Sequence, residues 1–184
     1  MADTDWVDDV NRFWFEEFGP KDWFSSSETL DKSIRDRFLP LHERLADTVP
    51  PLAKTEPKAA LAAILVLDQF PRNMFRGTAR AFASDALALD LSRHAVAQGF
   101  DRSLNKQGRQ FLYMPLMHSE TLADQDRSVE CFKALGSDEG LRFAEEHREI
   151  IGRFGRFPHR NEVLGRESTE AERVFLAEAD SYGQ

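Results

Sequence analysis

Apolar residues recur at intervals of three and four along most of this chain, the spacing that puts side chains on one face of an α-helix. The pattern is clearest near the start, where one face would consist of Trp6, Val10, Phe13, Trp14 and Phe18. Gly19 and Pro20 then end it. No stretch longer than a few residues alternates strictly between apolar and polar positions, as a half-buried strand would. The chain is therefore predicted to be all α.

The same periodicity predicts helices along the rest of the chain. They span 27–45, 58–70, 78–98, 104–117, 120–135, 138–154 and a last stretch after Thr169. The helix at 58–70 is apolar on nearly every side, so we expect it at the centre of the core. Pro40 predicts a kink or a break in the second helix, and Pro71 predicts the end of the third. The pattern predicts seven to nine helices in a single domain, residues 1–184, stacked as antiparallel hairpins of the tetratricopeptide kind.

Capping residues support several of these helix starts. Ser27, Ser119 and Ser137 are candidate N-caps, because a side-chain oxygen there accepts hydrogen bonds from N–H groups of the first turn. Thr169 and Glu172 have the spacing of a capping box. Each of these residues predicts where a helix begins.

Composition and charge narrow the function. Hydrophobic residues make up 41% of the chain and charged residues 30%, as in folded globular proteins. The net charge of −8 argues against nucleic-acid binding, which draws its energy largely from neutralising phosphates. The acidic start lacks a secretory signal, and the longest apolar run, Ala59 to Leu67, is too short to span a membrane. Cys131 is the only cysteine, which permits a reducing compartment. We therefore expect a cytoplasmic protein with no nucleic-acid or membrane partner.

Basic residues gather in two blocks of this acidic chain. Residues 71–109 sum to a formal charge of +4 and residues 150–166 to +3. The segments that contain or adjoin these blocks are also rich in Phe, Pro and Gly, which makes them unsuited to free surface. We predict that the segment 154–167 folds back on the turn 69–76, so that the two blocks line one cationic pocket.

Arginine-rich segments of this kind fit the recognition of a small anion. A guanidinium presents a planar fork of donors that matches a carboxylate or a phosphate. The candidate binding residues are Asp68, Gln69, Arg72, Asn73, Arg76, Asp126, Arg156, Arg160, Asn161 and Arg166. If the protein is an enzyme, the candidate acid–base groups are His118, Glu120 and His159, since an imidazole titrates near neutral pH.

Three alternatives stay open at this point. The arginines could pair with acids, among them Asp68, Asp85 and Glu120, in a buried ionic network that only fixes the packing. The stacked helices could be a scaffold that binds a protein partner in a groove. The pocket could hold the substrate of an enzyme. Neither a metal nor a cofactor is predicted, because none of His118, His147 and His159 has a partner at helical ligand spacing and no Gly-rich nucleotide loop follows a strand.

Five stretches of the sequence resemble a known family. They read FWFEEFGPKDWF, LDQFPRN, FRGTARAFASD, HSETLADQDRS and RFGRFPHRNEVLGREST. Together they look like the uncharacterised bacterial family called domain of unknown function 924, over residues 13–176. The resemblance implies an all-helical, tetratricopeptide-like fold. It implies no activity and assigns no role to any residue.

Overall fold

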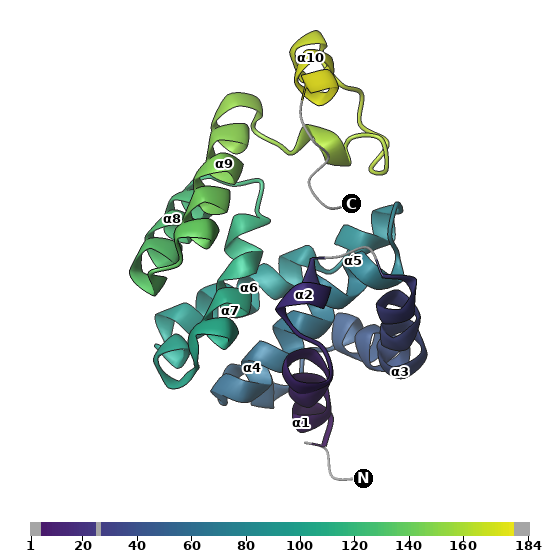
Figure 1. Cartoon of the computed structure of the whole chain (residues 1–184), viewed down its shortest axis with the longest axis vertical. Helices are drawn as coiled ribbons and strands as arrows, with labels where there is room; N and C mark the ends of the chain where they lie inside the picture. Colours follow the sequence, from purple (N-terminus) through teal and green to yellow (C-terminus); the bar gives the residue numbers. More distant parts are fainter. Residues whose placement is uncertain (1–4, 25–26, 179–184) are drawn as a thin grey trace.

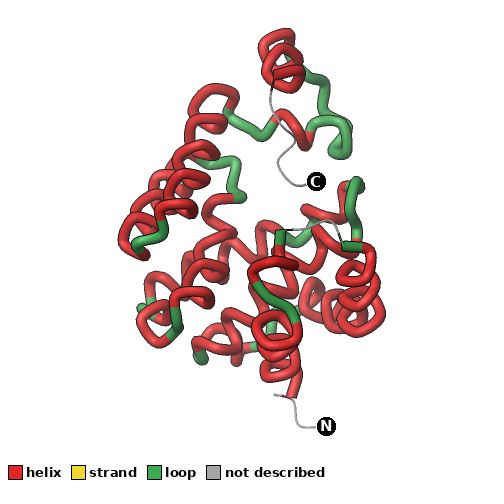
Figure 2. The backbone as a smooth tube through the Cα atoms, viewed as in Figure 1, coloured by secondary structure: helices red, strands yellow, loops and turns green. Residues whose placement is uncertain are grey.

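The computed structural model describes residues 5–24 and 27–178, and all regular structure in these ranges is helical (Figure 2). The α-helical segments are α1 (Asp5–Arg12), α2 (Pro20–Trp23), α3 (Glu28–Asp47), α4 (Pro57–Ile64), α5 (Phe70–Met74), α6 (Asp85–Ala97), α7 (Lys106–Met117), α8 (Leu122–Leu135), α9 (Asp138–Phe154) and α10 (Glu170–Glu178). Because a π-helical turn joins α4 to α5 without a break, these segments form nine helices within the described ranges. The predicted all-α class and helix number are confirmed.

Neighbouring helices in the sequence also pack together in space. Helices α6, α7, α8 and α9 contact one another in succession, while α3 packs on α5 and α1 on α4. Figure 1 shows α10 at one end of the longest axis of the molecule and α1 near the other. None of the described helices is both long enough and apolar enough to cross a membrane.

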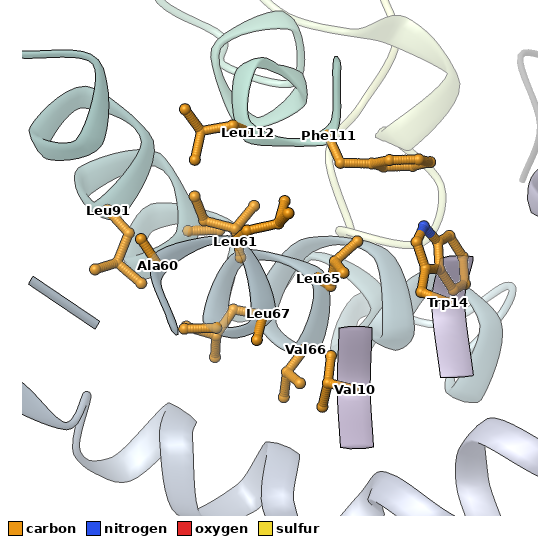
Figure 3. Packing of buried hydrophobic residues seen from close by; sticks show 14 of the residues in the cluster. Val10, Trp14, Ala60, Leu61, Leu65, Val66, Leu67, Leu91, Phe111 and Leu112 are labelled. Atoms are coloured by element: carbon orange, nitrogen blue, oxygen red, sulfur yellow. The ribbon is translucent and has the colours of Figure 1, made fainter. Parts of the chain in front are cut away.

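The helix that starts at Pro57 is the centre of the core, as its apolar sequence predicts. Every residue from Ala59 to Phe70 is buried. Figure 3 shows this helix between Leu112 of α7 on one side and Val10 of α1 on the other. An apolar stripe suffices for a helix at the surface, whereas a helix with neighbours all round needs apolar side chains on every side.

This central helix does not end at Pro71, so that prediction is wrong. Residues Leu65–Gln69 form a π-helical turn, in which the N–H of Phe70 bonds to the carbonyl of Leu65, and α5 then continues to Met74. Proline is tolerated at the first positions of a helical segment. The widened turn and the proline together make the transition from the apolar part of the helix to its polar end.

Side chains from other helices replace the backbone donor that Pro71 lacks. In a regular helix its N–H would bond to the carbonyl of Leu67, or to that of Val66 in a π turn. Instead the hydroxyl of Ser84 donates to the Leu67 carbonyl at 2.6 Å, and Nδ1 of His42 contacts the Val66 carbonyl at 3.1 Å. Buried carbonyl groups need such partners, and these two let the helix run on.

One further boundary differs from the sequence prediction, and one alternative is excluded. Of the kink or break predicted at Pro40, the break does not occur, because helix α3 continues through this residue. The predicted helix 78–98 is divided into a 3-10 turn, Ala79–Phe82, and α6, with Ser84 between them bonded to the central helix. The division at Ser84 comes with a hydrogen bond to a residue that is distant in sequence, Leu67.

The predicted caps are found at three of four positions. Ser27 accepts from the N–H of Leu30, and Ser137 from that of Gly140. Thr169 and Glu172 form the reciprocal capping box. Ser119 does not cap α8 as predicted, because its hydroxyl donates to Asp124 while α8 begins later, at Leu122.

Residues 155–178, called the C-terminal segment below, pack on a small core of their own. Helix α9 ends at Gly155, whose φ of 70° lies in the left-handed region that glycine tolerates best. Beyond it, Phe157 is fully buried against Ile150 and Ile151, and Phe175 of α10 packs on the same cluster. The chain changes direction at the end of α9 (Figure 1). Arg160 then pairs with Asp85 and Arg166 with Glu120.

Candidate functional site

A cavity of about 340 Å³ lies where three separate stretches of the chain meet, and we call it the site pocket. The stretches are the residues around the start of α6, the connection between α7 and α8, and the C-terminal segment. Its polar lining consists of Asp85, His118, Ser119, Glu120 and Arg160. Its apolar lining consists of Phe82, Leu89, Pro115, Leu164 and the alanines 79, 83 and 86. The volume is at the small end of the range for small-molecule sites.

His118 is held against a fully buried carboxylate. Its Nδ1 lies 2.8 Å from Oδ1 of Asp68, whose other oxygen accepts from the amide of Gln69 at 2.5 Å. Asp68 is 0% exposed. Burial opposes its ionisation, but the charge of Arg72 and the contact with His118 outweigh this and hold the pKa of Asp68 well below its usual value. Because an ionised carboxylate only accepts hydrogen bonds, Nδ1 of His118 is the donor.

The second nitrogen of His118, a residue that lines the site pocket, is not engaged by Asp68. With Nδ1 on Asp68, only Nε2 is left, and no described residue forms a hydrogen bond with it. Burial and the nearby charge of Arg72 lower the pKa of His118, although Asp68 acts in the opposite sense. His118 is thus a neutral imidazole at neutral pH, with an Nε2 able to accept a proton.

Arg72 and Arg160, one from each basic block, meet at one carboxylate. Arg72 binds Asp85 with both terminal nitrogens, at 2.9 and 3.0 Å, and also bonds to the backbone carbonyl of Asp68. Arg160 approaches the same Asp85 with Nη1 at 3.4 Å. Asp85 therefore bridges the segment 154–167 and the turn 69–76, because it pairs with Arg160 of the segment and with Arg72 of the turn.

Arg160 is the least compensated charge of the site. Its side chain is 9% exposed, and its guanidinium lies between the rings of Phe82 and Phe157, 4.6 Å from each centroid. Its Nε is buried and has no hydrogen-bond partner among the described residues. Burial, followed by the repulsion from Arg72, lowers its pKa to about 10, so it is still charged at neutral pH.

Glu120 joins the C-terminal segment to the connection between α7 and α8. It accepts two hydrogen bonds from Arg166, at 2.8 and 3.0 Å, and a third from the backbone N–H of Phe157 at 2.8 Å. Arg166 is itself oriented by the side-chain oxygen of Asn161 at 3.0 Å. Burial raises the pKa of Glu120, but these donors prevail and its pKa lies below the usual value. The carboxylate is therefore ionised and fully engaged.

The two other histidines of this region are half-buried near the pocket and do not line it. His147 contacts the ring of Phe157 edge-on at 5.4 Å, and His159 lies 5.5 Å from it on another side. Burial lowers the pKa of both imidazoles to about 4, assisted by His118 at His147 and by Arg160 at His159. Both are neutral at physiological pH. Of the three predicted acid–base candidates, His118 and Glu120 reach the pocket lining.

Several predicted binding residues are engaged away from the site pocket. Arg76 and Asn73 both bind Asp31 of α3. Arg156 pairs with Glu172 at 2.7 and 2.8 Å, and Asp126 pairs with the exposed Arg148. These residues hold helix ends together, as the alternative of a structural ionic network requires.

Sequence reasoning missed most of the pocket wall. Asp85 was weighed only as a partner in an ionic network, and Phe82, Leu89, Pro115 and Leu164 not at all as pocket residues. These side chains resemble ordinary core residues in the sequence, so no local signal distinguishes them. A sequence feature near Asp85 is Ser84, a residue type that favours helix starts, and the predicted helix is interrupted there, directly before α6 begins at Asp85.

The site combines three guanidinium groups with three carboxylates. Arg72, Arg160 and Arg166 face Asp68, Asp85 and Glu120, so the cluster is neutral overall while His118 is neutral. Within the described ranges, no three His, Cys, Asp or Glu side chains gather closely enough to hold a metal ion. The arrangement can bind one anionic group at Arg160 and exchange one proton at His118.

Comparisons with known proteins agree with the fold. Residues 10–180 match the family described as bacterial protein of unknown function, DUF924. A solved structure of the protein of unknown function ATU0120 from Agrobacterium tumefaciens is 40% identical, covers 94% of this chain and 97% of its own, and superposes with a TM-score of 0.89. No curated protein matches the chain. The chain therefore belongs to the DUF924 family.

Proposed function

We propose that this member of the DUF924 family binds a small carboxylate or phosphate compound in the site pocket, with Arg160 as the residue that receives the anionic group. The observation that carries the proposal is the state of Arg160 itself. It is a charged, buried guanidinium with one long contact to Asp85 and an Nε without a partner among the described residues. A buried donor left unsatisfied costs about 1–3 kcal/mol, and a ligand oxygen would remove that cost.

The surroundings of Arg160 favour a ligand with an apolar part. Phe82 and Phe157 fix the plane of its guanidinium, and Phe82, Leu89 and Leu164 offer apolar surface in the same cavity. Arg72 and Arg166 are fully occupied by Asp85 and Glu120, so they contribute to the field and not to direct binding. The proposal thus involves fewer arginines than the five predicted from the sequence, because only the guanidinium of Arg160 would contact the ligand.

Thermal denaturation with added anions tests the proposal. Phosphate, acetate and succinate should each be compared with sodium chloride at equal ionic strength. We expect at least one of these anions to raise the melting temperature of the wild type. At an anion concentration of one hundred times the dissociation constant, the free energy of unfolding should increase by about 2.7 kcal/mol. Arg160→Gln should abolish the rise, because the amide cannot hold the anionic group.

A matched control separates the ligand site from a purely structural network. Arg76 also pairs with a carboxylate, Asp31, but lies outside the pocket lining, so Arg76→Gln should leave the stabilisation by anions intact. If Arg160→Gln and Arg76→Gln both lower stability and no anion stabilises any of the three proteins, the arginines serve only to fix the packing.

The rival function, a scaffold for a protein partner, has less support. The large apolar side chains exposed among the described residues are Phe24, Leu122, Val174 and Leu176, which come from three different parts of the chain. A docking groove of stacked helices would need a continuous apolar surface. The tetratricopeptide-like arrangement and the cytoplasmic location stay predictions from the sequence.

A further inference from the structure

We propose that the site pocket is the active site of an acid–base enzyme, in which Nε2 of His118 takes a proton from a bound monocarboxylate substrate and returns one to it, while Asp68 orients the imidazole. This inference rests on the proposed function, because Arg160 must hold the substrate. His118 is the catalytic residue and Asp68 a positioning residue.

The orientation of His118 is built into the central helix. The π-helical turn and Pro71 hold Asp68 at the polar end of a fully buried helix, where Gln69 and Arg72 fix its carboxylate. Asp68 in turn accepts the proton of Nδ1, so the neutral imidazole has its lone pair on Nε2. A carboxylate in this position selects one tautomer of a catalytic histidine and stabilises the imidazolium that forms during the reaction.

The pocket suits a single negative charge better than a double one. Asp85 and Glu120 line it together with Arg160, so a phosphate dianion would face two carboxylates across a small cavity. A monocarboxylate would satisfy Arg160 and leave the cluster with one unbalanced negative charge. That negative charge raises the affinity of Nε2 for a proton, which favours the transfer. The total charge of the occupied site does not change, because the substrate gains one negative charge as His118 gains one positive charge.

The proton transfer balances without any further reactant. The substrate loses a proton from an O–H, N–H or C–H bond near its carboxylate, and the bonding electron pair stays on the substrate. The proton forms the new Nε2–H bond, while the Nδ1–H of His118 stays between the ring and Asp68. The reverse transfer, to the same atom or to a neighbouring one, returns the imidazole to its starting state.

Chemical modification of the histidines tests this without knowledge of the natural substrate. Diethyl pyrocarbonate acylates the unprotonated imidazole nitrogen, so we expect fast modification of His118, identified by mass spectrometry of the peptide that contains it. Asp68→Asn keeps the size of the side chain but can donate to Nδ1, which turns the ring to the other tautomer. The rate at His118 should then fall by about tenfold or more, as expected for a wrong tautomer. His94, which is outside the pocket, should react at the same rate in both proteins.

Propionate serves as the probe for the substrate site. It should slow the modification of His118 in the wild type and fail to do so in Arg160→Gln, whereas inorganic phosphate should protect less than propionate. If propionate protects His118 but Asp68→Asn has no effect on the rate, the pocket binds anions and the acid–base role is wrong. If Asp68→Asn slows the reaction but no anion protects, the binding role of Arg160 is wrong, and with it the enzyme proposed here.

A measurement on the wild type covers the case in which Asp68→Asn does not fold. Nitrogen-15 NMR of the imidazole groups distinguishes the two neutral tautomers, and His118→Asn identifies the signals. We expect the Nδ1–H form at neutral pH. The Nε2–H form would overturn the proposal, because its Nε2 has no lone pair to accept a proton.

Discussion

The main core and the C-terminal segment are held in place by different forces. The core is a continuous apolar cluster around the central helix, with side chains such as Trp14, Leu65 and Phe70 fully buried. The C-terminal segment packs in a small apolar cluster with Ile150 and Ile151 of α9, and it reaches α6 and the connection between α7 and α8 through polar contacts of Arg160, Arg166 and the N–H of Phe157. Apolar burial is non-directional and is not screened by ions, whereas ion pairs depend on geometry, pH and ionic strength. The site pocket lies where the two regions meet, so its shape depends on the weaker of the two kinds of contact.

The largest effect is expected from a cavity in the main core. Phe70 is fully buried and touches the rings of Phe13, Trp14 and Phe38, with centroids 5.0 to 6.0 Å away. Phe70→Ala should therefore cost about 3–5 kcal/mol of the free energy of unfolding, a large share of what a small domain has. Chemical denaturation at low and high salt measures this. The loss should be the same in both, and Val174→Ala, at an exposed position, should change stability by less than about 0.5 kcal/mol.

An intermediate effect, confined to one region, is expected from Glu120. Glu120→Ala removes the partner of Arg166 and of the Phe157 N–H, at a cost of about 1–3 kcal/mol for groups left without a bond. Hydrogen exchange should become faster in residues 155–178 and stay slow in the central helix. Arg148→Ala breaks an exposed pair with Asp126 and is the control, with no such local effect. Uniformly faster exchange over the whole chain would contradict the division into two regions.

The smallest effect is expected at low pH, as a structural change confined to the C-terminal segment. Glu120 and Glu172 have pKa values lowered from an ordinary 4.5, and that of Glu172 falls to about 2 through its hydrogen bonds to Arg156. A carboxyl group with a lowered folded pKa stabilises the structure above its unfolded pKa, and this contribution is lost as the pH falls through the folded one. NMR signals of residues 155–178 should therefore shift between about pH 4.5 and 2, before those of the core. Glu172→Gln should remove the part of this transition that lies nearest to pH 2, and a single transition shared with the core would contradict it.

The sequence predicted features whose causes are local. Hydrophobic periodicity depends on neighbours three and four residues away, so the helices and the buried central helix could be found without knowledge of the fold. The caps at Ser27 and Ser137 and the capping box at Thr169 are likewise decided within one turn of helix.

The sequence could not predict features whose causes lie far along the chain. Pro71 failed to end its helix because Ser84 and His42 supply hydrogen bonds that a local view cannot see. The arginines were predicted to be binding residues from their number and spacing, but their partners are set by the tertiary fold. Arg156 pairs with Glu172 of α10 and Arg76 with Asp31 of α3. Arg160 stands in the same arginine-rich segment as Arg156, yet it lines a cavity and has one long contact, to Asp85.

The wide turn at Leu65–Gln69 has a consequence for how the central helix can change during evolution or engineering. A π-helical turn is equivalent to one extra residue in an α-helix, and each residue of an α-helix advances it by about 100°. Losing that one residue would restore a regular helix and leave the apolar part packed as before. The residues after the turn would keep their orientation, because the wide turn already absorbs the extra residue that would otherwise rotate them by about 100°. Only the side chains inside the turn, Asp68 among them, would be placed differently. A single-residue deletion would thus separate the two properties of this helix, since the fold depends on its apolar part and the site on its wide turn.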